Sequence, residues 1–395
     1  MVVHVHVPLL VALAVAAAEK DTQSWAVPTA KLRNGIEYPL LGLGCASGVR
    51  KQHVVTALDL GYRLIDTAQA YHWGYHEHEV GEAIAESSVP RDEIFLQTKL
   101  MPRYLGYEST KKAIQRSLDN LKVDYLDSLL IHFPHCHHCQ TPPEGTWMDS
   151  WRAMEEAHSD NRIKAIGVSN FGVHLLRELW EKSSVKPMIV QNWMDPFHQD
   201  EDTRRFCQEH DTLFQGYSQF GTQWRYRRAG IEGLPVLSNQ MVQKVAEAHN
   251  VSTSQVVIRW MTGLGVSAIP ASTKRNHQKM NLDAMHFDLT PTDLKTLAAL
   301  DGFVPGKPKE EDHSVNAVFS NKLEEGLGLY WVGHDGQEVL QKELEAGDSI
   351  RISTYPGHVF TARMKNGEEE WRFEMRPEPK EQVFDIATKT SRDDL

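Results

Sequence analysis

The chain has 395 residues, of which 41% are hydrophobic, and a formal net charge of −11. This length can bury the core of one large α/β domain and of a smaller second domain. The acidic balance and the absence of a basic stripe argue against nucleic acid as a partner, and argue weakly against a strongly anionic substrate. The 4 cysteines are too few for a disulfide-stabilised scaffold.

The two ends of the chain carry patterns typical of targeting signals. An apolar run from Val7 to Ala18 is too short to span a bilayer, and its small-residue ending is typical of a signal peptide over residues 1–18. A linker over residues 19–30 follows. The last four residues, 392–395 (RDDL), resemble the tetrapeptide for retrieval to the endoplasmic reticulum. Together these patterns predict the secretory pathway and the lumen of the endoplasmic reticulum, with a cytoplasmic location as the alternative and with no membrane span.

The first folded element is predicted to be a small β-hairpin. The pair Asn34-Gly35 lies between two short apolar segments within residues 31–43. Asn-Gly favours the two positive φ angles of a type I′ hairpin turn. The hairpin opens the main domain, which we place at residues 31–302.

The main domain alternates short apolar runs with longer segments of helical spacing. Strands this apolar do not face water, so their alternation with helices predicts a parallel sheet. The number and length of the units match a (β/α)8 TIM barrel. A doubly wound open sheet is the alternative, weakened because no G-x-G-x-x-G follows the first strand. The predicted strands are residues 41–45, 62–67, 94–100, 125–132, 163–169, 187–191, 212–217 and 266–272. The clearest predicted helices are residues 53–60, 77–87, 110–121, 151–158, 174–182 and 239–249.

Polar side chains collect at the downstream ends of these strands. A charged residue that closes one apolar strand is often a helix cap or part of a surface turn, but most of the predicted strands share the pattern. In a TIM barrel these strand ends face one mouth, where active sites lie. The residues are Asp66, Lys99, His132, Ser169 with Asn170, Gln191, Tyr217 and Ser272.

Four residues of this region, Asp66, Tyr71, Lys99 and His132, have a defined chemistry as a set. A phenol, with a pKa of about 10, is a poor acid at neutral pH, but an adjacent ammonium stabilises the phenolate and lowers that pKa. A carboxylate keeps the ammonium charged, and a histidine can hydrogen-bond a substrate oxygen. Such a set can protonate a carbonyl oxygen that develops negative charge. None of the four is a good hydrolytic nucleophile and the chemistry requires no metal, so hydride transfer from a cofactor to a carbonyl fits best.

Motifs spaced through residues 31–302 resemble those of the aldo-keto reductase family. They are Leu41-Gly42-Leu43-Gly44, Ile65-Asp66-Thr67-Ala68 with Tyr71, Gln97-Thr98-Lys99, Leu130-Ile131-His132 and Gly167-Val168-Ser169-Asn170-Phe171. The resemblance implies a (β/α)8 barrel that reduces an aldehyde or ketone with NADPH and contains no Rossmann domain. It implies Tyr71 as the general acid, Lys99 and Asp66 as the pair that tunes its pKa, and His132 as the residue that orients the carbonyl. It further implies that His132 and the tryptophan of the pair Trp73-Gly74 contact the substrate.

The resemblance also assigns residues to the cofactor. Ser169, Asn170 and Gln191 match the positions that hold the nicotinamide carboxamide, and Tyr217 matches the aromatic residue that stacks on the nicotinamide ring. Stacking and carboxamide hydrogen bonds would present one face of the ring for hydride delivery. The segment that binds the cofactor phosphate is matched by Ser272, Thr273, Lys274 and Asn281.

The phosphate segment departs from the family pattern at two positions. The lysine that anchors the 2′-phosphate in the family is Ala271 here, and the family's arginine is His277. Lys274 and Arg275 could supply the positive charge from shifted positions. NADPH is therefore the expected cofactor and NADH the alternative.

The run His135-Cys136-His137-His138-Cys139 follows the strand that ends at His132 and is predicted to lie at the mouth. The two cysteines could form a disulfide, which suits an oxidising lumen, could bind zinc, or could stay reduced. Adjacent residues rarely supply a whole tetrahedral shell, so zinc ranks last and no metal is assigned. The disulfide and the reduced pair are supported equally.

The pattern changes near residue 303. Residues 303–315 form a linker rich in proline and charge, and short alternating segments beyond it predict a small all-β sandwich over residues 316–376. Residues 377–395 are predicted to be a disordered tail. The predicted strands are residues 317–320, 328–332, 349–353, 358–364 and 370–375.

Two segments of this module, residues 328–336 and 352–360, resemble the β domain of the von Hippel-Lindau tumour suppressor. That domain is a β-sandwich that binds a hydroxyproline-containing peptide. Trp331, Thr354 and His358 match the Trp, Ser and His of its pocket, whereas Phe360 replaces a second Trp. The alternative is that Trp331 and His358 are core and turn residues of the sandwich.

The sequence therefore predicts an NADPH-dependent aldehyde or ketone reductase with a β-sandwich that docks a peptide. The alternative function is a catalytically silent cofactor-binding sensor whose β domain binds a proline or hydroxyproline peptide. The set of four residues favours the enzyme, because a pure binding protein has no need of Lys99 beside Tyr71.

Overall fold

The structure is a computed structural model, and it describes residues 27–136, 139–228, 230–306, 315–333, 337–354, 357–365, 370–376, 379 and 381–387. The chain divides into two units between Gly306 and Lys307. The predicted signal peptide and the C-terminal tetrapeptide lie outside the described residues. Among the described helices, none is long and apolar enough to cross a lipid bilayer.

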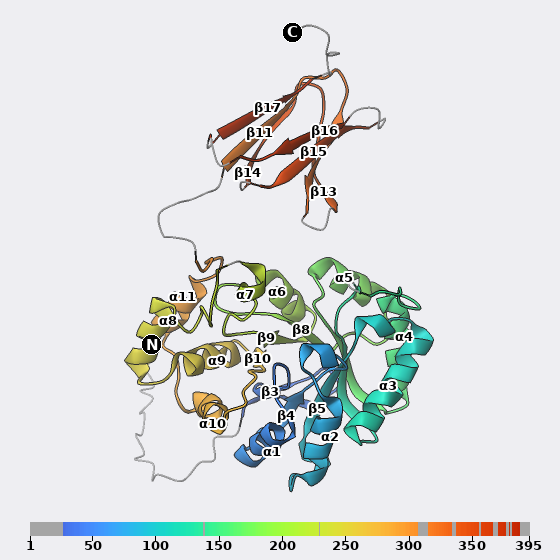
Figure 1. Cartoon of the computed structure of the whole chain (residues 1–395), viewed down its shortest axis with the longest axis vertical. Helices are drawn as coiled ribbons and strands as arrows, with labels where there is room; N and C mark the ends of the chain where they lie inside the picture. The colour runs from blue at the N-terminus through green and yellow to red at the C-terminus, as the bar shows by residue number, and fades with distance from the viewer. Residues whose placement is uncertain are drawn as a thin grey trace, which may run out of the picture. The chain divides into compact units, whose positions relative to one another are not determined.

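The first unit contains an 8-stranded parallel sheet with the strand order β10-β9-β8-β7-β6-β5-β4-β3. A bridge between Leu41 and Ala268 joins its two edges, and the Ala268 N–H donates to the Leu40 carbonyl at 2.9 Å. The sheet is therefore a nearly closed barrel with helices around it, which confirms the predicted TIM fold (Figure 1). The strands are β3 (Gly42–Gly44), β4 (Leu64–Asp66), β5 (Phe95–Leu100), β6 (Leu126–Ile131), β7 (Ile163–Ser169), β8 (Ile189–Trp193), β9 (Leu213–Tyr217) and β10 (Ser267–Ala268).

Several of the helices begin at a residue whose side chain accepts a hydrogen bond from the first turn. Capping boxes formed by Thr146 with Asp149 and by Ser252 with Gln255 start α4 and α9. The apolar faces of the helices pack on the outside of the strands in one continuous core. The helices are α1 (Lys51–Leu60), α2 (Glu77–Glu86), α3 (Tyr107–Leu121), α4 (Trp147–Ser159), α5 (Val173–Lys182), α6 (Glu201–Glu209), α7 (Trp224–Arg227), α8 (Gln240–His249), α9 (Thr253–Gly263), α10 (Arg275–Asp283) and α11 (Pro291–Ala298). Short 3-10 turns are η1 (Tyr71–Trp73), η2 (Arg91–Glu93), η3 (Pro102–Tyr104) and η4 (Ala284–His286).

The predicted N-terminal hairpin is present, but its turn differs from the expected one. Strands β1 (Thr29–Lys31) and β2 (Glu37–Pro39) pair antiparallel, with Lys31 opposite Glu37. Of the pair Asn34-Gly35 only the glycine has a positive φ, 87°. The loop between the strands carries its own hydrogen bond, from the Leu32 N–H to the Ile36 carbonyl at 2.8 Å. The longer loop therefore replaces the two-residue type I′ turn.

The second unit consists of two β-sheets, a 3-stranded sheet in the order β14-β11-β17 and a 4-stranded sheet in the order β13-β12-β15-β16. Phe319, Leu329 and Phe360 are buried in its core. All five predicted strands occur, and the sequence missed β13 and β17. The strands are β11 (Val315–Asn321), β12 (Leu327–Val332), β13 (Glu338–Leu344), β14 (Ser349–Thr354), β15 (Val359–Met364), β16 (Glu370–Glu374) and β17 (Glu381–Ile386).

Strand β17 corrects the prediction of a disordered tail from residue 377. It pairs parallel with β11, from Asn316 opposite Glu381 to Asn321 opposite Ile386. Gln382 and Ile386 are buried, whereas Val383 is exposed. The inward residues thus alternate with outward ones, a period-2 pattern that the charges around the strand obscured.

Candidate active site

Asp66 and Lys99 form a buried ion pair at the ends of β4 and β5. The Lys99 Nζ lies 2.6 Å from Oδ2 and 2.8 Å from Oδ1 of Asp66, and it also donates to the Thr67 carbonyl at 3.1 Å. Asp66 is 1% exposed and Lys99 is fully buried. Buried charges are tolerated when they are paired and hydrogen-bonded, and here all three ammonium hydrogens have an acceptor. The pair is therefore fixed in position.

Glutamine amides inside the barrel hold the Asp66 carboxylate from a second side. The Nε2 groups of Gln97 and Gln191 donate to Asp66 Oδ1 at 2.6 and 3.1 Å. Both amides also donate to Gln215 Oε1, at 2.7 and 2.6 Å, and Gln215 in turn donates to the Tyr38 hydroxyl at 2.8 Å. Gln191 thus directs its amide hydrogens to Asp66 and Gln215, and only its Oε1 could meet a cofactor carboxamide. Gln97 and Gln215 stand out in the sequence as polar residues inside apolar strands, but neither was predicted as a site residue.

His132, at the end of β6, is a neutral imidazole. Burial is the main cause that holds its pKa well below the usual range, and the charge of Lys99 and the proximity of His72 lower it further. Its Nδ1 is buried without a hydrogen-bond partner. Its ring lies edge-on to that of Trp73, with centroids 5.1 Å apart. A neutral imidazole can donate one hydrogen bond to a substrate oxygen without gaining charge.

The tyrosine that lies beside Lys99 is Tyr75, and this corrects the expectation for Tyr71. Tyr71 is 69% exposed and packs its ring on His76. Gly74 ends η1 with a φ of 84°, and this left-handed turn directs the next residue back toward the mouth. The Lys99 Nζ lies 5.2 Å from the centroid of the Tyr75 ring. The spacing from Asp66 therefore indicated the wrong tyrosine, because the turn adds residues before the buried phenol.

The pKa of Tyr75 is also shifted in the direction opposite to the one expected for the proton donor. Burial, followed by the carboxylate of Asp66, raises the pKa of Tyr75 well above its usual range. The ammonium of Lys99 was expected to lower the pKa of the phenol, but burial and the Asp66 carboxylate together raise it. The Tyr75 phenol is therefore protonated at neutral pH, which is the state that a proton donor requires.

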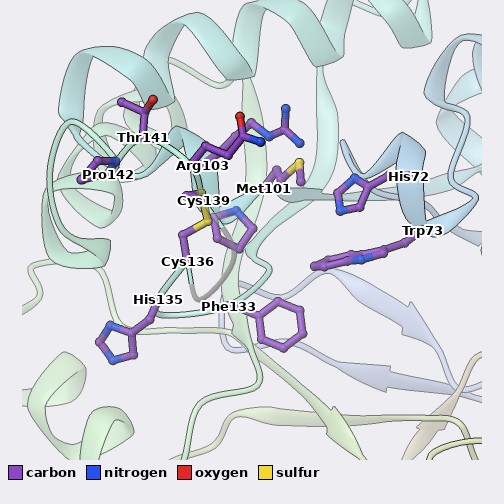
Figure 2. Close-up of a pocket in the computed structure, with 12 residues that line it drawn as sticks. His72, Trp73, Met101, Arg103, Phe133, His135, Cys136, Cys139, Thr141 and Pro142 are labelled. Atoms are coloured by element: carbon purple, nitrogen blue, oxygen red, sulfur yellow. A yellow bond between two sulfur atoms is a disulfide. The ribbon is translucent and has the colours of Figure 1, made fainter. Parts of the chain in front are cut away.

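A cavity of about 780 Å³ lies at the mouth of the barrel, and two of its lining residues, Trp73 and Phe133, have their ring centroids 5.1 Å from that of His132. Figure 2 shows His72 and Trp73 on one side of it, and Phe133, His135 and the two cysteines on the other. Trp73, the tryptophan expected to contact the substrate, thus lies at the cavity. This volume is within the usual range for a small-molecule site. The lining residues are His72, Trp73, Met101, Pro102, Arg103, Phe133, His135, Cys136, Cys139, Gln140, Thr141 and Pro142.

Cys136 and Cys139 form a disulfide in the wall of this cavity. The disulfide decides between the alternatives left open by the sequence, since neither sulfur is a thiolate that could bind zinc. His137 and His138, which lie between the cysteines, are outside the described residues.

Asn170 connects several of the predicted nicotinamide-binding residues. Its Nδ2 donates to the His132 carbonyl at 2.8 Å and to the Ser169 Oγ at 3.1 Å. Its Oδ1 accepts the hydroxyl hydrogen of Tyr217 at 2.6 Å. Asn170 adopts a left-handed backbone conformation with a φ of 61°, and strained positions of this kind are common at functional sites. The structure therefore brings Ser169, Asn170 and Tyr217 together beside His132.

A second cavity, of about 230 Å³, lies at the start of α10. The segment Ser272, Thr273 and Lys274 lines it, together with Ala271 and His277 and with Ser47 and Val49 from the loop between β3 and α1. Hydroxyls, an ammonium and the N-terminus of a nine-residue helix suit a phosphate. Asn281 is not part of this lining, because it is buried further along α10 and 4% exposed.

Asp195 is a buried carboxyl group near the mouth that the sequence analysis did not single out. Its Oδ2 accepts from the indole N–H groups of Trp193 and Trp224 at 2.8 and 3.0 Å, and its Oδ1 accepts from the Phe197 backbone N–H at 2.7 Å. Burial outweighs these hydrogen bonds and raises the pKa of Asp195 to about 7.

The raised pKa makes the stability of the barrel depend on pH. Below the folded pKa of about 7 and above the ordinary carboxyl pKa, the folded state binds more protons than the unfolded state, so stability falls as pH rises. This one group should lower the free energy of unfolding by roughly 2–3 kcal/mol between about pH 5 and pH 8. Urea unfolding at both pH values measures the change in the free energy of unfolding. Asp195→Asn should remove the part of this change that Asp195 causes. An equal pH dependence in both proteins would contradict the role of Asp195.

The second unit brings together the three residues expected at its pocket. The Thr354 Oγ1 and the His358 Nδ1 are 2.9 Å apart, and the His358 ring lies 5.6 Å from that of Trp331. The Trp331 Nε1 is buried without a hydrogen-bond partner. Phe360 is 2% exposed and packs on Phe319, so it belongs to the core.

Residues 49–301 match the model of the aldo/keto reductase family. The chain belongs to this family, and it is an NAD(P)H-dependent oxidoreductase that acts on carbonyl compounds. Glyoxal reductase of Bacillus subtilis is 36% identical over 276 residues, which cover 69% of this chain and 92% of that protein. The NADH-dependent D-xylose reductase of Candida parapsilosis is 32% identical over 305 residues, covering 70% of this chain and 93% of that protein. A solved structure of a Bombyx mori aldo-keto reductase in complex with NADP has a TM-score of 0.64 at 29% identity, and the match covers 70% of this chain and 94% of that one.

Proposed function

We propose that this enzyme reduces an aldehyde or ketone to an alcohol with NADPH, and that Tyr75 donates the proton. The observation that carries this proposal is the position of Tyr75, a neutral phenol whose ring lies 5.2 Å from the Lys99 ammonium and 6.0 Å from the His132 ring. These three groups provide a proton, a fixed positive charge and a hydrogen-bond donor at one place.

The chain's residues act on the carbonyl oxygen. His132 donates a hydrogen bond that orients the substrate and polarises the carbonyl. As negative charge develops on that oxygen, the Tyr75 O–H bond breaks and its proton forms the alcohol O–H bond. The phenolate that remains is stabilised by the Lys99 ammonium, which Asp66 keeps charged and in place. The chemistry that a bound nicotinamide cofactor supplies is the hydride for the carbonyl carbon.

The residues at the two cofactor regions fit a dinucleotide. Asn170 and Ser169 supply polar groups beside His132, and Tyr217 supplies an aromatic ring. The cavity at α10 supplies hydroxyls and the ammonium of Lys274. Two cations, Lys274 and the adjacent Arg275, favour NADPH over NADH, because the 2′-phosphate distinguishes the two cofactors by charge.

Lys274→Met should raise the KM for NADPH by about tenfold or more, since hydrogen bonds to charged groups are worth about 1.5–3 kcal/mol. The KM for NADH should change much less, because NADH lacks the 2′-phosphate. Lys279→Met is the matched control, as Lys279 lies on the same helix in an ion pair with Asp283. Equal effects of Lys274→Met on both cofactors would contradict the preference for NADPH.

The test of the enzyme class is NADPH oxidation with a panel of aldehydes and ketones. Turnover supports the reductase, whereas tight cofactor binding without turnover of any carbonyl would favour the alternative of a cofactor-binding sensor.

We further propose that the second unit binds a proline- or hydroxyproline-containing peptide at Trp331, Thr354 and His358. The buried, unpartnered Nε1 of Trp331 beside this cluster favours a ligand with a hydrogen-bond acceptor. Calorimetry of the full chain with matched proline and hydroxyproline peptides tests the proposal, with Thr354→Val as the variant that removes the hydroxyl. Absence of binding to either peptide would overturn it.

The Cys136–Cys139 disulfide also supports our proposal of a location in the lumen of the endoplasmic reticulum, because disulfides persist in oxidising compartments. A fluorescent reporter placed between residues 18 and 19 tests this location. A diffuse cytosolic signal would overturn it.

A further inference from the structure

The cavity at the mouth has a charge that differs from that of the whole chain. The chain is acidic, with a net charge of −11. The residues lining the cavity include Arg103, His72 and His135, and no aspartate or glutamate is among them. Interactions between charges act over about 8 Å in physiological salt, so these local groups matter more to a bound ligand than the overall net charge does.

Arg103 is the permanent cation of this cavity. It lies in η3, directly after β5, and its side chain is exposed to the cavity and solvent. No carboxylate of the described residues forms an ion pair with it, and its guanidinium lies 5.9 Å from the centroid of the Tyr104 ring. Arginine presents a planar fork of donors that suits carboxylate and phosphate groups. Its donors therefore remain available to a ligand.

The rest of the cavity is suited to an apolar body. Trp73 and Phe133 lie with ring centroids 5.6 Å apart, and both rings adjoin that of His132. Met101 and Pro102 line the wall next to Arg103. A ligand whose carbonyl reaches His132 would thus pass aromatic walls before it meets the guanidinium.

We propose that the substrate is an aldehyde or ketone that also carries an anionic group, a carboxylate or a phosphate, which Arg103 binds while the carbonyl lies at His132. This inference rests on the proposed function, because it places the reacting carbonyl at Tyr75 and His132. It also revises the expectation, drawn from the acidic composition, that a strongly anionic substrate is disfavoured, because the cation Arg103 lies in the cavity itself.

The experiment compares para-carboxybenzaldehyde, para-formylphenyl phosphate and the neutral methyl para-formylbenzoate in steady-state kinetics with the full chain. Arg103→Met should lower the ratio of kcat/KM for the anionic aldehydes to kcat/KM for the ester by about tenfold or more, through KM. Arg103→Lys should give a ratio between those of the wild type and Arg103→Met. Lysine keeps the positive charge but lacks the planar pair of donors of the guanidinium. Added salt should raise the KM for the anionic aldehydes in the wild type.

Arg116→Met is the matched control. The Arg116 guanidinium lies 4.9 Å from the same Tyr104 ring, but Arg116 does not line the cavity. It should leave the ratio unchanged. Which of the two anionic aldehydes loses more on Arg103→Met distinguishes carboxylate from phosphate. A ratio that is the same in wild type and Arg103→Met overturns the inference, whereas failure to reduce any of the three aldehydes would overturn the proposed function instead.

Discussion

Tyr75→Phe should reduce kcat for aldehyde reduction by about 10²–10⁴-fold, the usual contribution of a positioned general acid. The substitution removes only the hydroxyl, so the ring keeps its contacts with Lys99 and His132. Tyr71→Phe is the matched control and should change kcat little, because the Tyr71 side chain is largely exposed. Steady-state kinetics measure both variants, and fluorescence titration with NADPH checks that each still binds the cofactor.

The pH profile gives a second readout of the same assignment. The pKa of Tyr75 is raised well above its usual range and that of His132 is lowered well below it. Neither group should titrate near neutral pH, so kcat for the reduction should be flat there and should fall only when the phenol ionises at high pH. If Tyr71→Phe were inactive and Tyr75→Phe remained active, Tyr71 would be the proton donor, as the sequence predicts.

The sequence predicted the barrel well because a parallel sheet leaves a strong signal. Strands such as β5 and β6 are buried along their whole length, so their segments are rich in apolar residues and are separated by the more polar helical segments. Asp66, Lys99 and His132 were found by the same signal, since each closes one of these runs. The downstream ends of the strands all lie at one mouth of the barrel. A residue that ends a predicted strand in the sequence can therefore be placed at that mouth.

Residues on turns and inside the barrel were harder to predict. Tyr75 follows a turn at Gly74, and the number of residues in a turn is not set by the sheet. Gln97 and Gln215 lie mid-strand, and their partners come from strands far apart in sequence. Arg103 was not among the residues predicted for the site. The role that we propose for it depends on the absence of carboxylates from the described lining of the cavity, which only the folded chain reveals.

Lys99→Met should lower the free energy of unfolding of the barrel by about 3–5 kcal/mol, because it leaves the Asp66 carboxylate buried without a countercharge. Asp66→Asn should cost a similar amount, since the Lys99 ammonium then keeps only neutral acceptors. All the described helices lie in the first unit. Urea unfolding followed by the helical circular dichroism signal therefore reports the stability of the barrel.

The double variant Asp66→Asn/Lys99→Met tests whether charge or packing causes the loss. If the cost of each single variant is an uncompensated charge, removing both charges should cost clearly less than the sum of the two single changes. Gln97 and Gln191 still donate to the side chain at position 66 in Lys99→Met, so this variant should be the less damaging of the two singles. Lys182→Met, which breaks the exposed pair with Glu178, should change stability far less. If the costs in the double variant are additive, side-chain packing rather than charge causes the loss of stability. The Asp66–Lys99 pair would then matter for the charge that it places beside Tyr75 and would contribute little to the stability of the barrel.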